Sequence, residues 1–306
     1  FNETTYFEPF GTSLRMSDLG YSNSTQARLK ISLNSLDGYI RDLNCAICTP
    51  EPDYEKIGVK VDGSYRQLSA NQLQIENEYY SPIRPKRVAR SGERPTAALR
   101  RGGVEYVEVR SLDLNVFDPV GVNQNAMRVM EAFLIYCLLS DSPPIDAGDW
   151  REISRNHGET ARNGRDPAFR LLRDGKQVSL AAWATEIVED VRAIADLIDR
   201  GEGGDAYVSA VDAQAALIDD PDATPSARVL EEMRRNDTGF FHFAMDMARG
   251  HKQYFRELEP LADDRLAVYT SEATRSIEQQ QLVEASDEIS FDEYLQQYFS
   301  EQGCCD

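Results

Sequence analysis

The sequence predicts an α+β protein in which strands come before helices along the chain. Two stretches of alternating polar and apolar residues, 74–80 and 104–113, predict strands, because successive side chains of a strand point to opposite faces. Beyond Asp118 and Pro119 the apolar residues recur every three or four positions instead, which is typical of amphipathic helices. Strands grouped ahead of helices favour an α+β arrangement over a succession of strand–helix–strand units.

The first element that the sequence predicts is an amphipathic helix that ends before Pro50 and Pro52. Its apolar residues alternate between three- and four-residue spacing, as one face of a helix requires. Asp62 and Gly63 then predict a tight turn, since Asp-Gly is a strong signal for a hairpin. The apolar residues of the helix are Leu33, Leu36, Ile40, Leu43 and Ile47.

The two predicted strands carry ionisable side chains on one face. In residues 104–113, Val107 and Val109 share the apolar face. If the strands are neighbours, their polar faces line a common cleft. The polar faces consist of Glu76, Glu78 and Tyr80 in residues 74–80, and of Tyr106, Glu108 and Arg110 in residues 104–113.

The connection between the two strands, residues 81–103, is expected to be a basic loop. Three interpretations are open: a solvated loop, an RNA-binding segment, or a loop that screens the triphosphate of a nucleotide through Arg84 and Lys86. RNA binding is the weakest of the three, because the segment lacks interleaved aromatic residues and the whole chain is anionic. The basic residues are Arg84, Lys86, Arg87, Arg90, Arg94, Arg100 and Arg101.

The remainder of the chain is predicted to be mainly helical. A largely apolar helix over 125–140 is expected to end before Pro143. A second helix has Ser179 as its N-cap, an apolar stripe from Leu180 to Ile198, and Gly201 past its end. Further helices are expected over 207–218, 226–235, 240–258 and 274–285.

The net charge of −19 falls almost entirely after residue 120. Such acidity favours solubility and argues against nucleic acid or an anionic membrane as a partner. The longest apolar run, 132–139, is too short to span a bilayer, and no signal peptide is visible. We therefore expect a cytoplasmic protein.

The five cysteines and three histidines form no clear metal or redox motif. Cys45 and Cys48 make a C-x-x-C pair, but no second pair stands at zinc-finger spacing. We expect structural or incidental roles for this pair, and a terminal tail around Cys304 and Cys305. Free thiols suit a reducing cytoplasm.

Motifs that the sequence lacks narrow the chemistry. Neither the dinucleotide motif G-x-G-x-x-G nor a P-loop occurs, and there is no nucleophile elbow. Carboxylates, arginines and tyrosines remain as candidates. Mg²⁺ selects carboxylate oxygens, and the planar fork of arginine suits phosphate. Glu108 and Arg110 thus predict either a site for phosphoryl chemistry or a structural ion pair on one face.

Three segments of the sequence closely resemble the bacterial glutamate–cysteine ligase family, which catalyses the first step of glutathione synthesis. They are residues 11–21 (GTSLRMSDLGY), 74–87 (QIENEYYSPIRPKR) and 101–113 (RGGVEYVEVRSLD). Three long motifs in the family's order and at its separations make the resemblance specific. It is dense from Phe10 to about Val122 and looser through the helical remainder.

The resemblance implies a reaction of L-glutamate with L-cysteine that depends on ATP and Mg²⁺. In this family the γ-carboxylate of glutamate attacks the γ-phosphate of ATP, and the amine of cysteine captures the resulting γ-glutamyl phosphate. Glu108 falls where the family has a Mg²⁺ ligand, and Arg110 falls where an arginine contacts the transferring phosphoryl group. Arg15, Tyr21 and Tyr80 match positions around the cysteine substrate.

The resemblance also implies a fold. The family is similar to the catalytic core of glutamine synthetase, a curved antiparallel sheet with helices around it. Residues 1–122 would form the C-terminal part of this sheet domain, and residues 123–306 a helical region that packs on or beside it.

In the family a substantial segment precedes the motif at 11–21, and we expect this chain to lack it. In the family this part supplies further acidic metal ligands, a histidine and part of the cysteine pocket. We therefore expect this chain to be the C-terminal portion of such a ligase, with an N-terminal segment of the same enzyme as its partner. Two alternatives stay open: a ligase of the same fold that uses another amine, and a non-catalytic relative that serves as a binding module.

Overall fold

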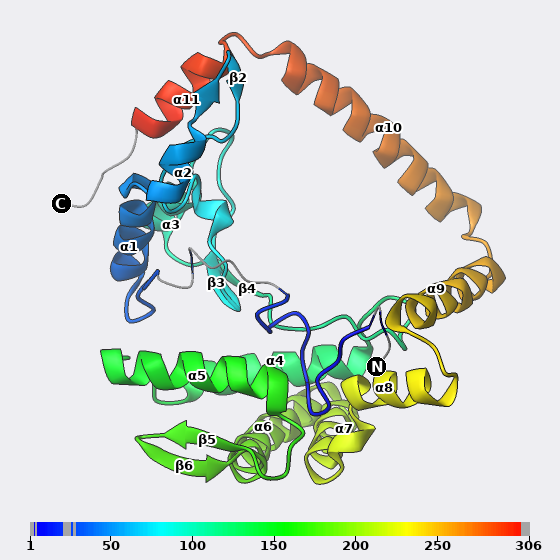
Figure 1. Cartoon of the computed structure of the whole chain (residues 1–306). Coiled ribbons are helices and arrows are strands. Elements are labelled where there is room, and N and C mark those ends of the chain that lie inside the picture. Colours follow the sequence, from blue (N-terminus) through cyan, green and yellow to red (C-terminus); the bar gives the residue numbers. More distant parts are fainter. Residues whose placement is uncertain (1–2, 4, 21–25, 27–28, 301–306) are drawn as a thin grey trace. The chain divides into compact units, whose positions relative to one another are not determined.

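Helices form most of the part of the chain that the structure describes, and the strands there make three two-stranded antiparallel sheets (Figure 1). This computed structural model describes residues 3, 5–20, 26 and 29–300. The mixture of helices and antiparallel strands agrees with the predicted α+β class.

The chain divides into two units, and each has its own buried core. The first unit comprises Phe1–Ala27, Tyr80–Lys86 and Glu105–Lys252, and the second comprises Arg28–Tyr79, Arg87–Val104 and Gln253–Asp306.

The second unit is built on helix α1, Leu36–Cys48. Ser35 caps its first turn, where the hydroxyl accepts a hydrogen bond from the backbone N–H of Gly38 (3.1 Å). The predicted apolar stripe is buried, and each large apolar side chain removed from water in this way contributes about 1.5–3 kcal/mol. The core consists of Ile31, Tyr39, Ile40, Leu43, Ala46, Ile47, Leu73, Tyr79 and Leu99.

Short elements follow α1 in this unit. After α2 (Pro52–Ile57), strands β1 (Lys60–Val61) and β2 (Ser64–Tyr65) pair as a hairpin. Asp62 and Gly63 have positive φ angles of 52° and 78°, so the predicted tight turn is confirmed. The remaining elements of the unit are η2 (Glu76–Glu78), α3 (Pro95–Gly102), α10 (Asp263–Ala285) and α11 (Phe291–Ser300).

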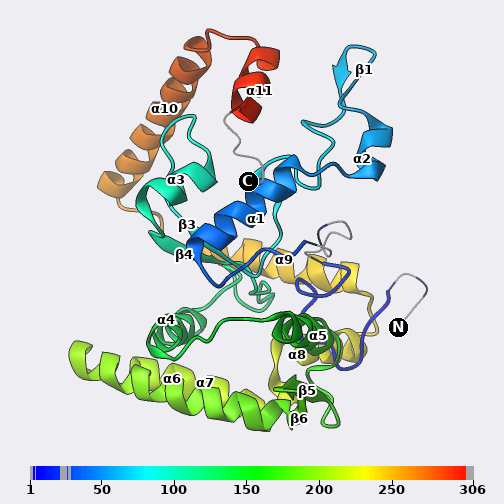
Figure 2. The ribbon, with the colours of Figure 1, turned by 90° about the vertical axis from the view of Figure 1, so that its left-hand side faces the viewer.

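The first unit contains a strand pair and a group of packed helices. The strands are β3 (Ile83–Lys86) and β4 (Tyr106–Val109). Helices α4 (Gln124–Leu139), α6 (Leu180–Glu202) and α7 (Ala206–Asp219) pack together, and Figure 2 shows α6 and α7 side by side. The unit also holds α5 (Ala147–Asn163), β5 (Arg170–Arg173), β6 (Lys176–Ser179), η3 (Pro221–Ala223), α8 (Pro225–Arg235) and the start of α9 (Phe240–Glu257).

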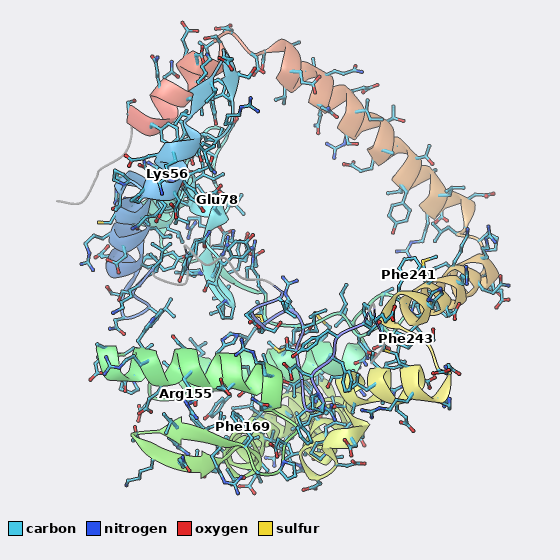
Figure 3. All side chains as sticks on the ribbon, in the orientation of Figure 1. Lys56, Glu78, Arg155, Phe169, Phe241 and Phe243 are labelled. Atoms are coloured by element: carbon cyan, nitrogen blue, oxygen red, sulfur yellow. The ribbon has the colours of Figure 1, made fainter. Side chains whose placement is uncertain are left out.

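The prediction of a strand over residues 74–80 is wrong. The 3₁₀ helix η2 occupies Glu76–Glu78 instead, in the second unit, where Figure 3 labels Glu78. The carboxylate of Glu78 accepts a hydrogen bond from the backbone N–H of Gln74 (2.7 Å), which closes a turn within the segment.

Glu76 explains why the alternating pattern was misleading. Its side chain is buried and pairs with Arg94, whose Nη2 lies 2.6 Å from Oε1. The hydroxyls of Thr96 (2.7 Å) and Tyr298 (2.8 Å) donate to the same carboxylate. The polar residue therefore marks a buried ion pair and not the solvent face of a strand.

Residues 81–103 are not a single loop, because they contain β3 and α3. Arg84 and Lys86, which were expected in a loop, lie on β3. The strand could not be predicted because of Pro82 and Pro85, since proline is disfavoured in sheets except at edges.

The helical half agrees with most of the predicted helices but differs in detail. Ser179 caps α6 as predicted, accepting from the backbone N–H of Ala182 (3.4 Å). This helix continues past Gly201 to Glu202, and Gly203, whose φ is 80°, is its C-cap. The hairpin of β5 and β6 interrupts the region that was expected to be helical, with a turn at Asp174 and Gly175.

The long helices α6 and α10 have 23 residues each. Neither they nor any other helix of the described residues has the apolar length that crossing a membrane requires. In α10 no residue is buried.

Two of the cysteines are not free thiols. Cys45 and Cys48, both in α1, are disulfide-bonded, whereas Cys137 is free. The expectation of free thiols is therefore wrong for Cys45 and Cys48, because spacing in the sequence does not reveal pairing. Cys304 and Cys305 lie outside the described residues.

Candidate functional site

The candidate site lies on one face of the two-stranded ribbon of β3 and β4. In the antiparallel register Arg84 lies opposite Glu108, and Lys86 lies opposite Tyr106. Residues that oppose each other in antiparallel strands project to the same side of the sheet. Arg110 follows β4 and contacts Glu108, so it extends the same side. We call Arg84, Lys86, Glu108 and Arg110 the cationic face.

Glu108 is held between two cations of this face. Nη2 of Arg110 donates to Oε1 of Glu108 at 3.0 Å, and Nε of Arg110 lies 3.0 Å from Oε2. Nζ of Lys86 lies 3.4 Å from Oε2. The hydrogen bond from Arg110 and the positive charges of both neighbours outweigh the effect of burial and lower the pKa of the Glu108 carboxyl. The group is therefore a carboxylate at neutral pH.

The cationic face combines three basic side chains with one carboxylate: Lys86 and Arg110 contact Glu108, and Arg84 lies opposite it in the register. Arg84 is 4% exposed, and the side chains of Lys86 and Arg110 are each 24% exposed. Partly desolvated guanidinium groups bind phosphate or carboxylate more strongly than fully exposed ones, and their planar fork fixes orientation. The arrangement suits a multiply charged anion.

Arg15 reaches the end of β4 that carries Arg110. Its Nε donates a hydrogen bond to the backbone carbonyl of Arg110, and its backbone N–H donates to Oδ1 of Asp113 at 2.9 Å. The structure thus brings three of the predicted site residues, Arg15, Glu108 and Arg110, to one part of the first unit.

Tyr80 begins the segment that leads into β3. Its backbone N–H donates to Oε1 of Gln26 at 2.7 Å, and its side chain is 38% exposed. Tyr21 lies outside the described residues. Glu76 and Glu78 do not contribute to this site as predicted, because they belong to η2 of the second unit.

A metal ion would find only part of its ligand set here. Among residues 3, 5–20, 26 and 29–300, no group of three or more His, Cys, Asp and Glu side chains could hold a metal. Glu108 offers two oxygen atoms of the kind that Mg²⁺ prefers. Glu108 could therefore serve as one ligand of a Mg²⁺ ion.

Sequence reasoning missed Asp113 and Ser13, which connect the motif at residues 11–21 to the end of β4. The carboxylate of Asp113 accepts hydrogen bonds from the hydroxyl of Ser13 and from the backbone N–H of Arg15. Both residues stand inside motifs that the sequence analysis singled out. A serine and an aspartate at such positions are the usual partners of backbone N–H groups in turns, which was the available signal.

The sequence is similar to glutamate–cysteine ligases over nearly its whole length. The model of that family, described as glutamate-cysteine ligase, matches residues 1–160. The glutamate–cysteine ligase of Alcanivorax borkumensis is 47% identical over 308 residues, which cover 96% of this chain and 57% of the relative. That of Pseudomonas paraeruginosa is 45% identical over 298 residues, covering 97% and 56%. The chain spans little more than half the length of these relatives.

Solved structures agree with the sequence comparisons. The crystal structure of glutamate–cysteine ligase from Francisella tularensis in complex with AMP has a TM-score of 0.88 and 37% identity, covering 97% of this chain and 58% of that chain. A bifunctional glutathione synthetase from Pasteurella multocida shares the fold, with a TM-score of 0.59 and 17% identity over 83% of this chain and 28% of that one. This chain belongs to the glutamate–cysteine ligase family.

Proposed function

We propose that this chain is part of an enzyme that joins the γ-carboxyl of L-glutamate to the amine of L-cysteine, with ATP and through a γ-glutamyl phosphate. The observation that carries the proposal is the cationic face, where Lys86 and Arg110 contact Glu108 and Arg84 lies opposite it. Membership of the glutamate–cysteine ligase family names the reaction.

The cationic face suits the first chemical step. The γ-carboxylate of glutamate and the γ-phosphate of ATP are both anions, so they repel each other unless positive charge lies between them. Arg110, beside Glu108, is proposed to contact the transferring phosphoryl group. Arg84 and Lys86 are proposed to contact the nucleotide phosphates, and the AMP in the Francisella tularensis relative supports a nucleotide at this fold.

Glu108 is proposed as a Mg²⁺ ligand. Its lowered pKa keeps the carboxylate charged at any pH where the enzyme would work. When bound, Mg²⁺ neutralises phosphate oxygens and orients them. The other ligands are proposed to come from the part of the relatives that this chain does not match.

Arg15, Tyr21 and Tyr80 are proposed to bind the amine substrate. A guanidinium binds the carboxylate of an amino acid in a bidentate manner, and a phenol hydroxyl adds a hydrogen bond. With its carboxylate held in this way, cysteine would present its amine to the acyl phosphate. When the amine attacks the acyl phosphate, phosphate is the leaving group.

The ribbon of β3 and β4 is proposed to belong to a larger curved antiparallel sheet, similar to that of glutamine synthetase. On this view residues 1–122 are the C-terminal part of a catalytic sheet domain, and residues 123–306 are a helical region. A cytoplasmic location is part of the same proposal.

The test uses this chain joined to the part of the Alcanivorax borkumensis relative that it does not match, referred to as the complete enzyme. We expect ADP release that requires glutamate and an amine, and hydroxylamine should trap the acyl phosphate when the amine is omitted. Cysteine compared with other amines identifies the substrate. A folded complete enzyme that binds ATP without ever releasing ADP contradicts the proposal and favours a binding module.

A further inference from the structure

Asp113 holds the segment that carries Arg15 at two points. Its Oδ2 accepts a hydrogen bond from the hydroxyl of Ser13, and its Oδ1 accepts one from the backbone N–H of Arg15 at 2.9 Å. Asp113 lies just beyond β4, on the same stretch of chain as Glu108 and Arg110. One carboxylate therefore links two distant motifs of the sequence.

The contacts of Asp113 continue into a compact turn. The hydroxyl of Ser13, which donates to Asp113, also accepts from the backbone N–H of Met16 at 3.0 Å. The backbone N–H of Ser17 donates to the carbonyl of Leu14 at 3.3 Å. A carboxylate that accepts from a turn in this way stabilises it as an N-cap stabilises a helix.

The turn closes tightly around Arg15. A Cβ atom at Gly20 would clash with the carbonyl oxygen of Leu14 and would lie 2.5 Å from that of Arg15. No side chain fits between them, so residue 20 must be glycine for the chain to pass here.

The preceding part of the segment is fixed separately, by Arg165. Its Nη2 donates to the carbonyl of Pro9 at 2.6 Å, its Nε to that of Gly11 at 3.2 Å, and its backbone N–H to that of Phe10 at 3.1 Å. The backbone N–H of Thr12 donates to the carbonyl of Ala161 at 2.9 Å. Residues 9–12 thus stay attached to the end of α5 whether or not Asp113 is present.

The two attachments give Asp113 a defined task. Arg165 fixes where the segment starts, and Asp113 fixes the turn that follows it, next to the carbonyl of Arg110 that accepts from Nε of Arg15. Other contacts of the turn do not involve Asp113: Nε of Arg15 donates to the carbonyl of Arg110, Asp18 pairs with Arg162 at 2.7 Å, and the backbone N–H of Ser13 donates to the carbonyl of Ala161 at 3.3 Å. None of these three contacts involves the backbone N–H of Arg15, which donates to Asp113. A side chain that binds a substrate must be held within about 0.5 Å, and such precision comes from surrounding hydrogen bonds.

We propose that Asp113 is a positioning residue, which presents the Arg15 guanidinium to the carboxylate of an α-amino acid that serves as the amine substrate. The proposal rests on the proposed function for the role of Arg15. Asp113 should therefore affect the binding of the amine substrate and should not affect the binding of ATP.

The first test measures hydrogen exchange of residues 13–17 in this chain and needs no catalysis. Asp113→Asn keeps the size of the side chain but removes the charge and one acceptor, so we expect faster exchange at Arg15 and Met16. Loss of a hydrogen bond worth about 1 kcal/mol corresponds to roughly a fivefold increase. Asp141→Asn, at an exposed position, is the matched control. Equal exchange in the two variants overturns the proposal.

The second test measures steady-state kinetics in the complete enzyme. For Asp113→Asn we expect the KM for cysteine to rise about tenfold while kcat and the KM for ATP stay near the values of Asp141→Asn, because uniform binding of one substrate is lost. Asp113→Glu, which keeps the carboxylate, should recover part of the loss. Asp113→Asn combined with Arg15→Ala should be no worse than Arg15→Ala alone.

The outcomes separate this inference from the proposed function. If kcat falls in Asp113→Asn, or if the KM values for cysteine and ATP rise together, Asp113 is not a positioning residue for the amine substrate. If the Asp141→Asn enzyme itself releases no ADP, the proposed function fails and the substrate role of Asp113 fails with it. In that case altered hydrogen exchange supports only the attachment of the turn.

Discussion

Arg84 lies directly opposite Glu108 in the antiparallel register of β3 and β4. Arg84 is 4% exposed, whereas the side chain of Glu108 is 34% exposed. Because a guanidinium keeps its charge at every pH that a protein tolerates, this buried cation gives the cationic face a permanent positive component. Lys86 and Arg110 add to it from the two sides of Glu108. The face therefore combines three cations with a single carboxylate, which pairs with Lys86 and Arg110.

We predict that Glu108→Gln abolishes most of the turnover of the complete enzyme with little effect on folding. The amide keeps the shape of the side chain but is a poor Mg²⁺ ligand. The ion pairs that it loses are about a third exposed, so their contribution to stability is at most about 1 kcal/mol. Activity as a function of Mg²⁺ concentration, together with the melting temperature, checks both statements.

The matched control for this change is Glu189→Gln, at an exposed position of α6 in the same unit. It should leave turnover and melting temperature unchanged. If Glu108→Gln reaches normal turnover at saturating Mg²⁺, Glu108 is a partner of Arg110 and Lys86 and not a metal ligand.

Arg110→Lys is predicted to slow formation of the acyl phosphate roughly a hundredfold, which is typical for the loss of one donor to a transition state. Lysine retains the charge but lacks the planar fork, so it cannot donate to Glu108 and to a phosphoryl oxygen in the same geometry. Single-turnover measurement of ADP formation isolates this step. A variant with the normal rate would limit Arg110 to its ion pair with Glu108.

The polar face of β4 could be predicted from sequence because its alternation is genuine. Val107 and Val109 lie on one side, and Glu108 pairs with Arg110 on the other. The partner strand could not be predicted in the same way, since Pro85 interrupts the alternation of β3. In residues 74–80 the same alternation is produced by Glu76, which is buried in an ion pair with Arg94. Alternation alone does not distinguish these two causes.

Contacts between segments that are distant in the chain also could not be predicted from the sequence. Arg15 and Asp113 stand far apart in the chain, and nothing in their local patterns predicts that one donates to the other. Arg15 was a candidate from the resemblance, whereas Asp113 was missed although it stands inside one of the three motifs. The resemblance thus supplied the candidate residues, and the structure supplied the hydrogen bonds that Arg15 makes with Asp113 and Arg110.

Tyr80→Phe is predicted to raise the KM for cysteine without changing the KM for ATP. Tyr80 is 38% exposed, so the substitution does not disturb a buried core, and phenylalanine keeps the aromatic ring. Only the hydroxyl group is lost, which should cost a substrate hydrogen bond of about 0.5–1.5 kcal/mol and raise KM up to roughly tenfold. A parallel increase for ATP would indicate a change in the ribbon itself.

The carboxylate of Glu93 is predicted to stabilise the second unit in a pH-dependent manner. Hydrogen bonds from Arg101 and from the backbone N–H of Arg90 lower the pKa of this carboxyl from 4.5 to about 2. A lowered pKa in the folded state gives stability that is present above pH 4.5 and is lost as pH falls through about 2.

The measurement compares urea unfolding of this chain and of Glu93→Gln over a series of pH values. The chain should be the more stable of the two near neutral pH. The difference should shrink below pH 4.5 and vanish near pH 2. A difference that is independent of pH would mean that the charge of Glu93 does not contribute.

The last prediction concerns Tyr298, which attaches α11 to the buried ion pair of Glu76 and Arg94. Its hydroxyl donates to Oε2 of Glu76 at 2.8 Å, and burial together with the charge of Glu76 raises the pKa of the phenol. Tyr298→Phe leaves the carboxylate one donor short in a buried position, so the second unit should lose about 1–3 kcal/mol of unfolding free energy. Tyr294→Phe, whose ring is 45% exposed on the same helix, is the matched control and should change stability by less than about 0.5 kcal/mol. Equal stability of the two variants would show that Glu76 is satisfied by Arg94 and Thr96 alone, and that α11 is held by its other contacts, such as the ion pair of Asp292 with Lys60 and the packing of Phe299.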